Sequence, residues 1–182
     1  MRLSLVLLVA LSVAGCDSDD SLLGEFVGTT EIGSQARAVD GEAVYTVLDG
    51  PNGPEFVLGL FVGDLYDSDL DAYDYVLFRR PGDRPGAGAY GVDNDPDRAF
   101  NATIARVEDA DEPLEAEGSV LNGVDGTLAI TRVDGYGFLV GSYEFIAEGV
   151  RVGPSSGFVE GAARGTFEAR YESPSTFRAL GL

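Results

Sequence analysis

The chain has 182 residues with 31 acidic and 12 basic side chains, and it contains no His, no Trp and a single Cys. The lack of imidazole excludes Ser-His-Asp and Cys-His catalysis, and with one Cys it also excludes a structural zinc site. The negative charge repels nucleic acid and anionic lipid headgroups, so neither is an expected partner.

The first 15 residues are predicted to be a cleaved export signal. Arg2 precedes the apolar run Leu3–Val13, which is too short to span a bilayer. The residues Val13-Ala14-Gly15-Cys16 match the lipobox of bacterial lipoproteins, in which the Cys thiol receives a diacylglyceryl group before cleavage. We therefore predict lipid attachment at Cys16 and a mature protein held on a membrane of the cell envelope.

Residues 16–24 are predicted to form the lipidated Cys and an acidic tether. The segment Asp17–Ser21 is typical of a solvated linker. It is similar to the acidic export signal of surface lipoproteins in Bacteroidetes-type bacteria, whereas in enteric bacteria an Asp after the Cys favours inner-membrane retention. The outer membrane or cell surface is the location that we favour.

Residues 25–182 are predicted to fold as a single antiparallel all-β domain. Short runs of β-branched and aromatic residues alternate with Gly, Pro, Asp and Asn, and helical periodicity is missing. Asp134-Gly135 indicates a tight hairpin turn. The pattern leaves open an up-and-down, calycin-like barrel and a two-layer sandwich. The eight predicted strands are Phe26–Glu31, Ala43–Leu48, Phe56–Val62, Tyr73–Arg80, Ala99–Val107, Thr127–Val133, Phe138–Ala147 and Thr166–Tyr171.

Alternation along these strands assigns their faces, and the third strand is apolar on both, which predicts a central position. Long polar connections are expected at residues 63–72, 81–98, 108–126 and 148–164. Residues predicted to share one face within a strand are Phe100, Ala102 and Ile104, then Leu139, Tyr143 and Phe145, and finally Phe167, Ala169 and Tyr171.

A barrel would offer its open end to one small ligand, or it would simply fill itself with side chains. Both alternatives involve the same large apolar residues on the inward faces. The candidate ligand-binding residues are Phe56, Leu58, Phe100, Tyr143 and Phe167.

Two acidic loops have the spacing of a calcium loop's first three ligands. The first has Ala72 where an EF-hand needs Gly and Phe78 where it needs Glu, and the second has Ile104 at that last position. Neither is an EF-hand, and no other cofactor is predicted. Such carboxylates can still collect around Ca²⁺, and solvated turns are the alternative. The candidate calcium ligands are Asp67, Asp69, Asp71, Asp93, Asp95 and Asp97.

Other motifs give no enzyme assignment. Gly86–Gly91 fits G-x-G-x-x-G but lacks the flanking strand and helix of a dinucleotide site, which predicts a glycine-rich loop that leads into a strand. Asp125-Gly126-Thr127 inverts part of the aspartic-protease triplet. A carboxylate-only hydrolase would need two converging acids, and Glu144 and Glu168 fit an outward strand face equally well.

Two stretches carry a resemblance to a known group. Pro85–Tyr90 looks like a turn leading into a strand, and Gly126–Tyr171 repeats glycines and aromatic residues in the manner of consecutive strands that close a sheet. Together they resemble uncharacterised small secreted lipoproteins of Bacteroidetes type with a calycin-like β-barrel domain. The resemblance implies a barrel fold and no established activity.

The leading hypothesis is therefore a non-catalytic binding domain at the cell envelope, anchored to the membrane by its N-terminal lipid. It would bind an unknown small molecule. The alternative is an accessory subunit that docks on an outer-membrane protein complex through a sheet edge or the glycine-rich loops. A solvent-filled apolar cavity favours the first, an exposed apolar patch the second, and two acids in one cleft the hydrolase.

Overall fold

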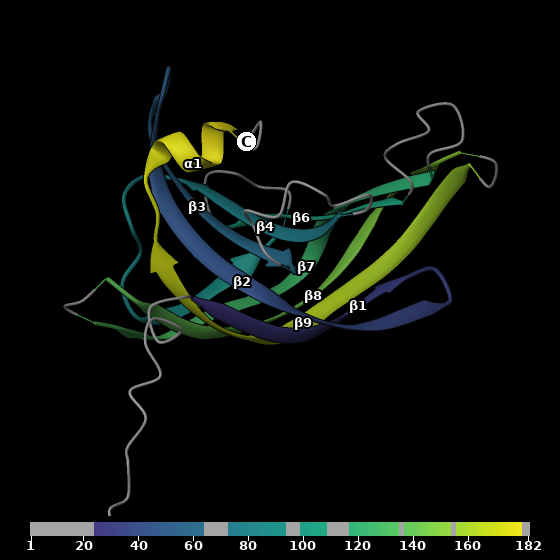
Figure 1. Cartoon of the computed structure of the whole chain (residues 1–182), viewed down its shortest axis with the longest axis horizontal. Coiled ribbons are helices and arrows are strands. Elements are labelled where there is room, and N and C mark those ends of the chain that lie inside the picture. Colours follow the sequence, from purple (N-terminus) through teal and green to yellow (C-terminus); the bar gives the residue numbers. More distant parts are fainter. Residues whose placement is uncertain are drawn as a thin grey trace, which may run out of the picture.

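The computed structural model describes residues 24–63, 73–93, 99–108, 117–134, 137–153 and 156–179. This part of the chain is almost entirely β-sheet, with one short helix after the last strand (Figure 1). The elements are β1 Glu25–Ile32, β2 Gln35–Gly50, β3 Gly53–Val62, β4 Tyr73–Pro81, β5 Gly88–Val92, β6 Asn101–Glu108, β7 Glu117–Val133, β8 Leu139–Val152, β9 Gly157–Tyr171 and α1 Pro174–Ala179.

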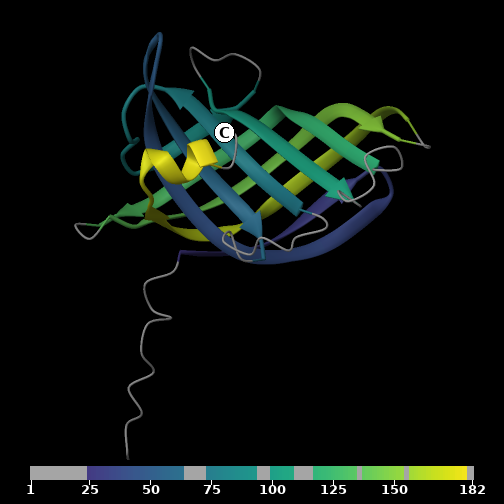
Figure 2. The same cartoon turned by 45° about the horizontal axis from the view of Figure 1, so that its top comes forward.

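The sheet closes on itself as an eight-stranded antiparallel barrel. Its order is β1-β2-β3-β4-β6-β7-β8-β9, and β9 pairs back onto β1, so that Phe26 lies opposite Phe167. Neighbours in the barrel are neighbours in the chain, except for the closing pair β9–β1 and for β4 and β6, which β5 separates in sequence. The strands run diagonally around the barrel, as closure requires (Figure 2). Of the two architectures left open by the sequence, the structure has the up-and-down barrel.

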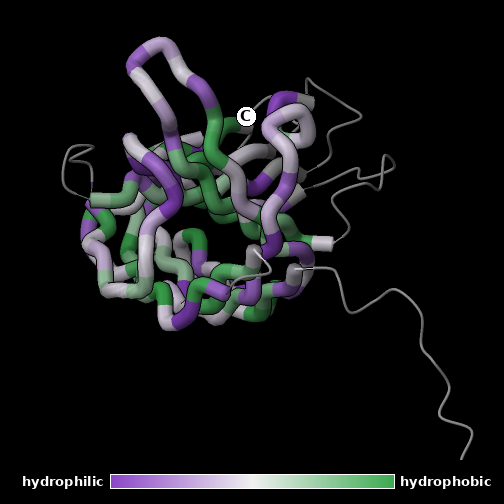
Figure 3. The backbone as a smooth tube through the Cα atoms, turned by 90° about the vertical axis from the view of Figure 1, so that its left-hand side faces the viewer, coloured by the Kyte–Doolittle hydropathy of each residue, from purple (hydrophilic) through white to green (hydrophobic). Residues whose placement is uncertain are grey.

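The alternation of side chains predicts the inner face correctly along most strands. Phe100, Ala102 and Ile104 all lie in the core, and the hydropathy of the chain alternates around the barrel wall (Figure 3). The exception is Tyr171, which falls at the end of the barrel, where its exposed ring meets the edge of Tyr45 with centroids 5.8 Å apart. β7 and β8 pair as consecutive antiparallel strands, with Val133 opposite Leu139, so the predicted hairpin is present. The Phe138 amide donates to Asp134 Oδ1 at 2.9 Å, and Gly135 of the predicted tight turn lies outside the described residues.

Two of the expected connections were wrong because strands continue through them. β7 begins at Glu117, β8 runs to Val152 and β9 starts at Gly157. These segments are rich in Gly and Glu, which have low strand propensity on their own, but here each pairs with a neighbouring strand. The glycines allow close packing inside: a Cβ at Gly161 would fall 2.6 Å from the Leu121 side chain.

Strand β5 lies in the predicted connection at residues 81–98, where part of the glycine-rich segment was expected to lead into a strand. It pairs with residues 126–130 of β7, on the same side of β7 as β6. A parallel bridge between Val92 and Phe100 joins β5 to the start of β6. β5 therefore continues the barrel wall beyond the start of β6.

Helix α1 was not predicted. Pro174 opens it, and Phe177 is fully buried against the outside of β2, β3 and β4, where it packs with Val44, Val57 and Leu77. This cover explains why β3 is apolar on both faces, since Leu58 points into the barrel and Val57 lies under the helix. No helix in the described part of the chain has the length and apolar character needed to cross a membrane.

Candidate functional site

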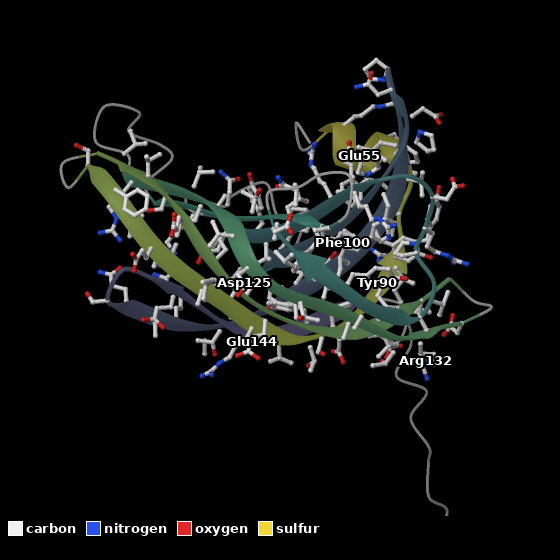
Figure 4. The ribbon with its side chains drawn as sticks, turned by 180° about the vertical axis from the view of Figure 1, so that it is seen from behind. Glu55, Tyr90, Phe100, Asp125, Arg132 and Glu144 are labelled. Atoms are coloured by element: carbon white, nitrogen blue, oxygen red, sulfur yellow. The ribbon has the colours of Figure 1, made fainter. Side chains whose placement is uncertain are left out.

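The five residues proposed to line a ligand site all point into the barrel and belong to one buried cluster. None is more than 3% exposed. The rings of Phe56 and Phe100 meet edge to face with centroids 6.0 Å apart, and Phe100 contacts Tyr90 in the same way at 5.5 Å (Figure 4). Side chains thus pack closely at the positions where a bound molecule was expected, and small-molecule binding stays a prediction.

Tyr143 has an unusual place in this core. Its ring packs against Phe78, and its hydroxyl lies over two glycines that face it on β1 and β9; a Cβ at Gly165 would fall 2.7 Å from the hydroxyl oxygen. No described residue hydrogen-bonds this hydroxyl. Burial raises the pKa of the Tyr143 phenol well above its ordinary value. The hydroxyl is therefore neutral and unpaired in an apolar setting.

Most of the predicted calcium and lipid positions lie outside the described residues. These are Cys16, Asp67, Asp69, Asp71, Asp95 and Asp97. Asp93 is described, just after β5, where its amide donates to the Phe100 carbonyl at 3.2 Å. Among described residues, no three Asp, Glu or Cys side chains gather in a way that could hold a metal ion. Calcium binding stays a prediction.

One end of the barrel interior holds a buried ion pair that sequence reasoning missed. Arg106 Nε on β6 lies 3.0 and 3.1 Å from the two carboxylate oxygens of Asp74 on β4, and Arg106 Nη2 donates to Thr30 Oγ1 at 3.1 Å. Arg37 also contacts Asp74, at 3.3 Å. The sequence did contain a signal for this ion pair. Asp74 lies two residues before Val76, and Arg106 lies two residues after Ile104, so alternation places both charged side chains on inward faces.

The hollows described on this protein lie on the outside of the barrel, over β7, β8, β9 and β1. The first, which we call the outer hollow, has a volume of about 350 Å³ and is lined by Asp125, Glu144, Arg164 and Glu31, among others. Asp125 and Glu144 are labelled in Figure 4. Three acids, Glu31, Asp125 and Glu144, thus line one hollow, and all three side chains are exposed to water. The absence of catalysis stays a prediction.

A second feature of this side is a row of exposed apolar side chains, the apolar row. Val120 on β7, Val150 on β8 and Phe158 on β9 lie directly opposite one another across three strands. Their exposed fractions are 46%, 54% and 69%. Val152 and Ile146 add exposed apolar surface on β8. Single exposed apolar residues are ordinary on a protein surface, whereas these three are contiguous across three strands.

A pair of like charges lies beside the apolar row. Glu148 on β8 is directly opposite Glu160 on β9, and Asn122 on β7 completes this second row. Directly opposed side chains on neighbouring strands are about 5 Å apart at Cβ, so the two carboxylates repel each other. Both are exposed, and neither forms an ion pair with a described residue.

Comparison with known proteins adds no assignment. No protein-family model matches the chain, no curated protein matches it in sequence, and no solved structure matches its fold. The resemblance to small secreted lipoproteins therefore stays a prediction.

Proposed function

We propose that this protein is a non-catalytic lipoprotein of the bacterial cell envelope, anchored through Cys16, that docks on a protein partner through the outer face of β7, β8 and β9. The observation that carries the proposal is the apolar row of Val120, Val150 and Phe158, which is contiguous across three strands and exposed. The two alternatives were a domain that binds a small molecule and a subunit that docks on a protein complex. An exposed apolar patch together with a packed interior favours the docking subunit.

The position of the row relative to the predicted anchor supports a protein partner. The described chain enters the barrel at the start of β1, and the eight residues of β1 lead to the opposite end, where Ile32 pairs with Gly161. Phe158 lies beyond that pair, near the tip of the β8–β9 hairpin. A strand of this length spans about 25 Å. A membrane that holds Cys16 would thus lie nearer the other end of the barrel.

Charge also argues against a lipid surface as the occupant. After residue 15 the chain carries 31 acidic and 11 basic side chains, a net charge of −20. Such a protein is repelled by anionic headgroups, and the acidic residues nearest the row strengthen this locally. A folded protein partner buries the apolar row without that penalty.

Photo-cross-linking in the native host tests this function. A photoreactive phenylalanine analogue at position 158 should give a discrete protein adduct in intact envelopes. The matched control is the same analogue at Val27, which is similarly exposed on the outside of β1, and it should give none. Adducts only with lipid, or equal adducts from both positions, would overturn the docking proposal.

A further inference from the structure

We infer that the partner brings Lys or Arg side chains to the Glu148–Glu160 pair while its apolar side chains cover Val120, Val150 and Phe158. This inference rests on the proposed docking function and deepens it, because it names the chemistry of the occupant. The two rows are adjacent on the same strands, since Glu148 and Val150, like Glu160 and Phe158, are two residues apart and share the outward face.

The described chain supplies no cation of its own to this pair. Arg151, the nearest arginine along β8, points inward and donates from Nε to Ser119 Oγ at 3.4 Å. Arg164 faces outward, but it lies opposite Glu144, two rows away, where it lines the outer hollow. Two opposed carboxylates are thus left without a counter-charge from the described residues.

A partner with Lys or Arg side chains relieves the repulsion between Glu148 and Glu160. A second copy of this chain or an anionic membrane does not. A second copy docked through the same face would add two more carboxylates to the interface, because a symmetric interface contains the same residues from both copies. An anionic membrane would do the same. A segment with apolar side chains flanked by Lys or Arg is complementary to both rows at once, and such complementarity fixes register and partner choice.

The sequence offers a chemical means of testing this. The chain contains no Lys at all, so a carbodiimide cannot join its carboxylates to its own side chains. With the full-length protein, we would use as probe a short peptide that alternates Val and Lys, with a Val/Gln peptide of equal length as control. Every side-chain amide cross-link must then come from the probe, and mass spectrometry places it on a residue.

The expected result is binding of the Val/Lys peptide, weaker in high salt, with cross-links at Glu148 and Glu160. The double variant E148Q/E160Q should weaken binding about tenfold, the order expected for losing close interfacial charge pairs. The matched control is E25Q/E168Q, which removes two equally opposed carboxylates from the other end of β9 and should change binding less than about twofold.

Equal binding of the two peptides, or equal loss in both double variants, would overturn the cationic partner. These results are distinguishable from failure of the docking function itself. If photo-cross-linking from position 158 captures a protein in the envelope while the peptide experiment fails, docking stands and the partner is not cationic. If position 158 captures nothing, both proposals fail. Thermal unfolding at a temperature no lower than that of the wild type, in each double variant, shows that any loss of peptide binding does not come from loss of the fold.

Discussion

Two parts of the barrel's outer surface carry apolar side chains, and they differ in whether a helix of the same chain covers them. Over β2, β3 and β4 the outward residues Val44, Leu48, Val57 and Leu77 lie beneath α1, where Phe177 is fully buried. Over β7, β8 and β9 the apolar row has no cover from described residues, and Phe158 is 69% exposed. The chain thus covers one apolar face with its own helix, whereas no described residue covers the other.

The largest expected effect is on stability and separates two phenylalanines. Phe177→Ala should lower the free energy of unfolding by about 3 kcal/mol, because it removes a buried ring from the α1-covered face. Phe158→Ala should change it by less than about 0.5 kcal/mol, since that ring already contacts water. Urea unfolding measures both, and equal losses would contradict the contrast between the two faces.

A smaller effect on the free energy of unfolding is expected from a buried hydroxyl on the face that α1 covers. Thr46 is fully buried between Val44 and Leu48, and no described residue hydrogen-bonds its hydroxyl. Thr46→Val should therefore stabilise the protein by about 1 kcal/mol. Thr166→Val on the exposed face is the matched control and should have almost no effect in the same unfolding experiment. A loss of stability in Thr46→Val would show that the hydroxyl has a partner.

Tyr143 gives a comparable effect inside the barrel, with a pH signature. Removing its unpaired hydroxyl in Tyr143→Phe should stabilise the protein by about 1 kcal/mol at neutral pH. Because burial raises the pKa of the folded phenol, only the unfolded chain ionises as the pH rises above about 10, and the wild type loses stability there. The variant should lose less between neutral and strongly alkaline pH, and identical profiles would contradict this account of Tyr143.

The smallest expected effect is a gain in the free energy of unfolding when one carboxylate of the Glu148–Glu160 pair is removed. Glu148→Gln should stabilise the isolated protein by about 0.5 kcal/mol, since it relieves the repulsion with Glu160. Glu25→Gln is the control at the other end of the barrel, where the opposed Glu168 already has an ion-pair partner in Arg132 at 3.6 Å, and its gain should be smaller. Thermal unfolding at low salt resolves the difference, and no gain in Glu148→Gln would remove the argument that the pair is strained.

Sequence reasoning predicted the strands and their inner faces where alternation is strong, as in Phe100, Ala102 and Ile104. It missed α1 because six residues with a single anchoring Phe carry no helical period. It also missed the ion pair, because Asp74 and Arg106 meet only through the pairing of β4 with β6. The apolar row was unreachable for a related reason: Val120, Val150 and Phe158 lie in segments whose glycines and acids predicted connections, so no face could be assigned to them.

We expect the apolar row to be covered by a partner in the envelope and bare in the isolated protein. Because Cys16 is the chain's single Cys and is predicted to be lipidated, Phe158→Cys and Val27→Cys each introduce one reactive thiol. Labelling with a membrane-impermeant maleimide, in intact envelopes and after purification, tests the claim directly. We predict that Phe158→Cys is protected in envelopes and labelled once purified, whereas Val27→Cys is labelled in both. Equal labelling of Phe158→Cys in the two settings would show that no partner covers the apolar row in the envelope.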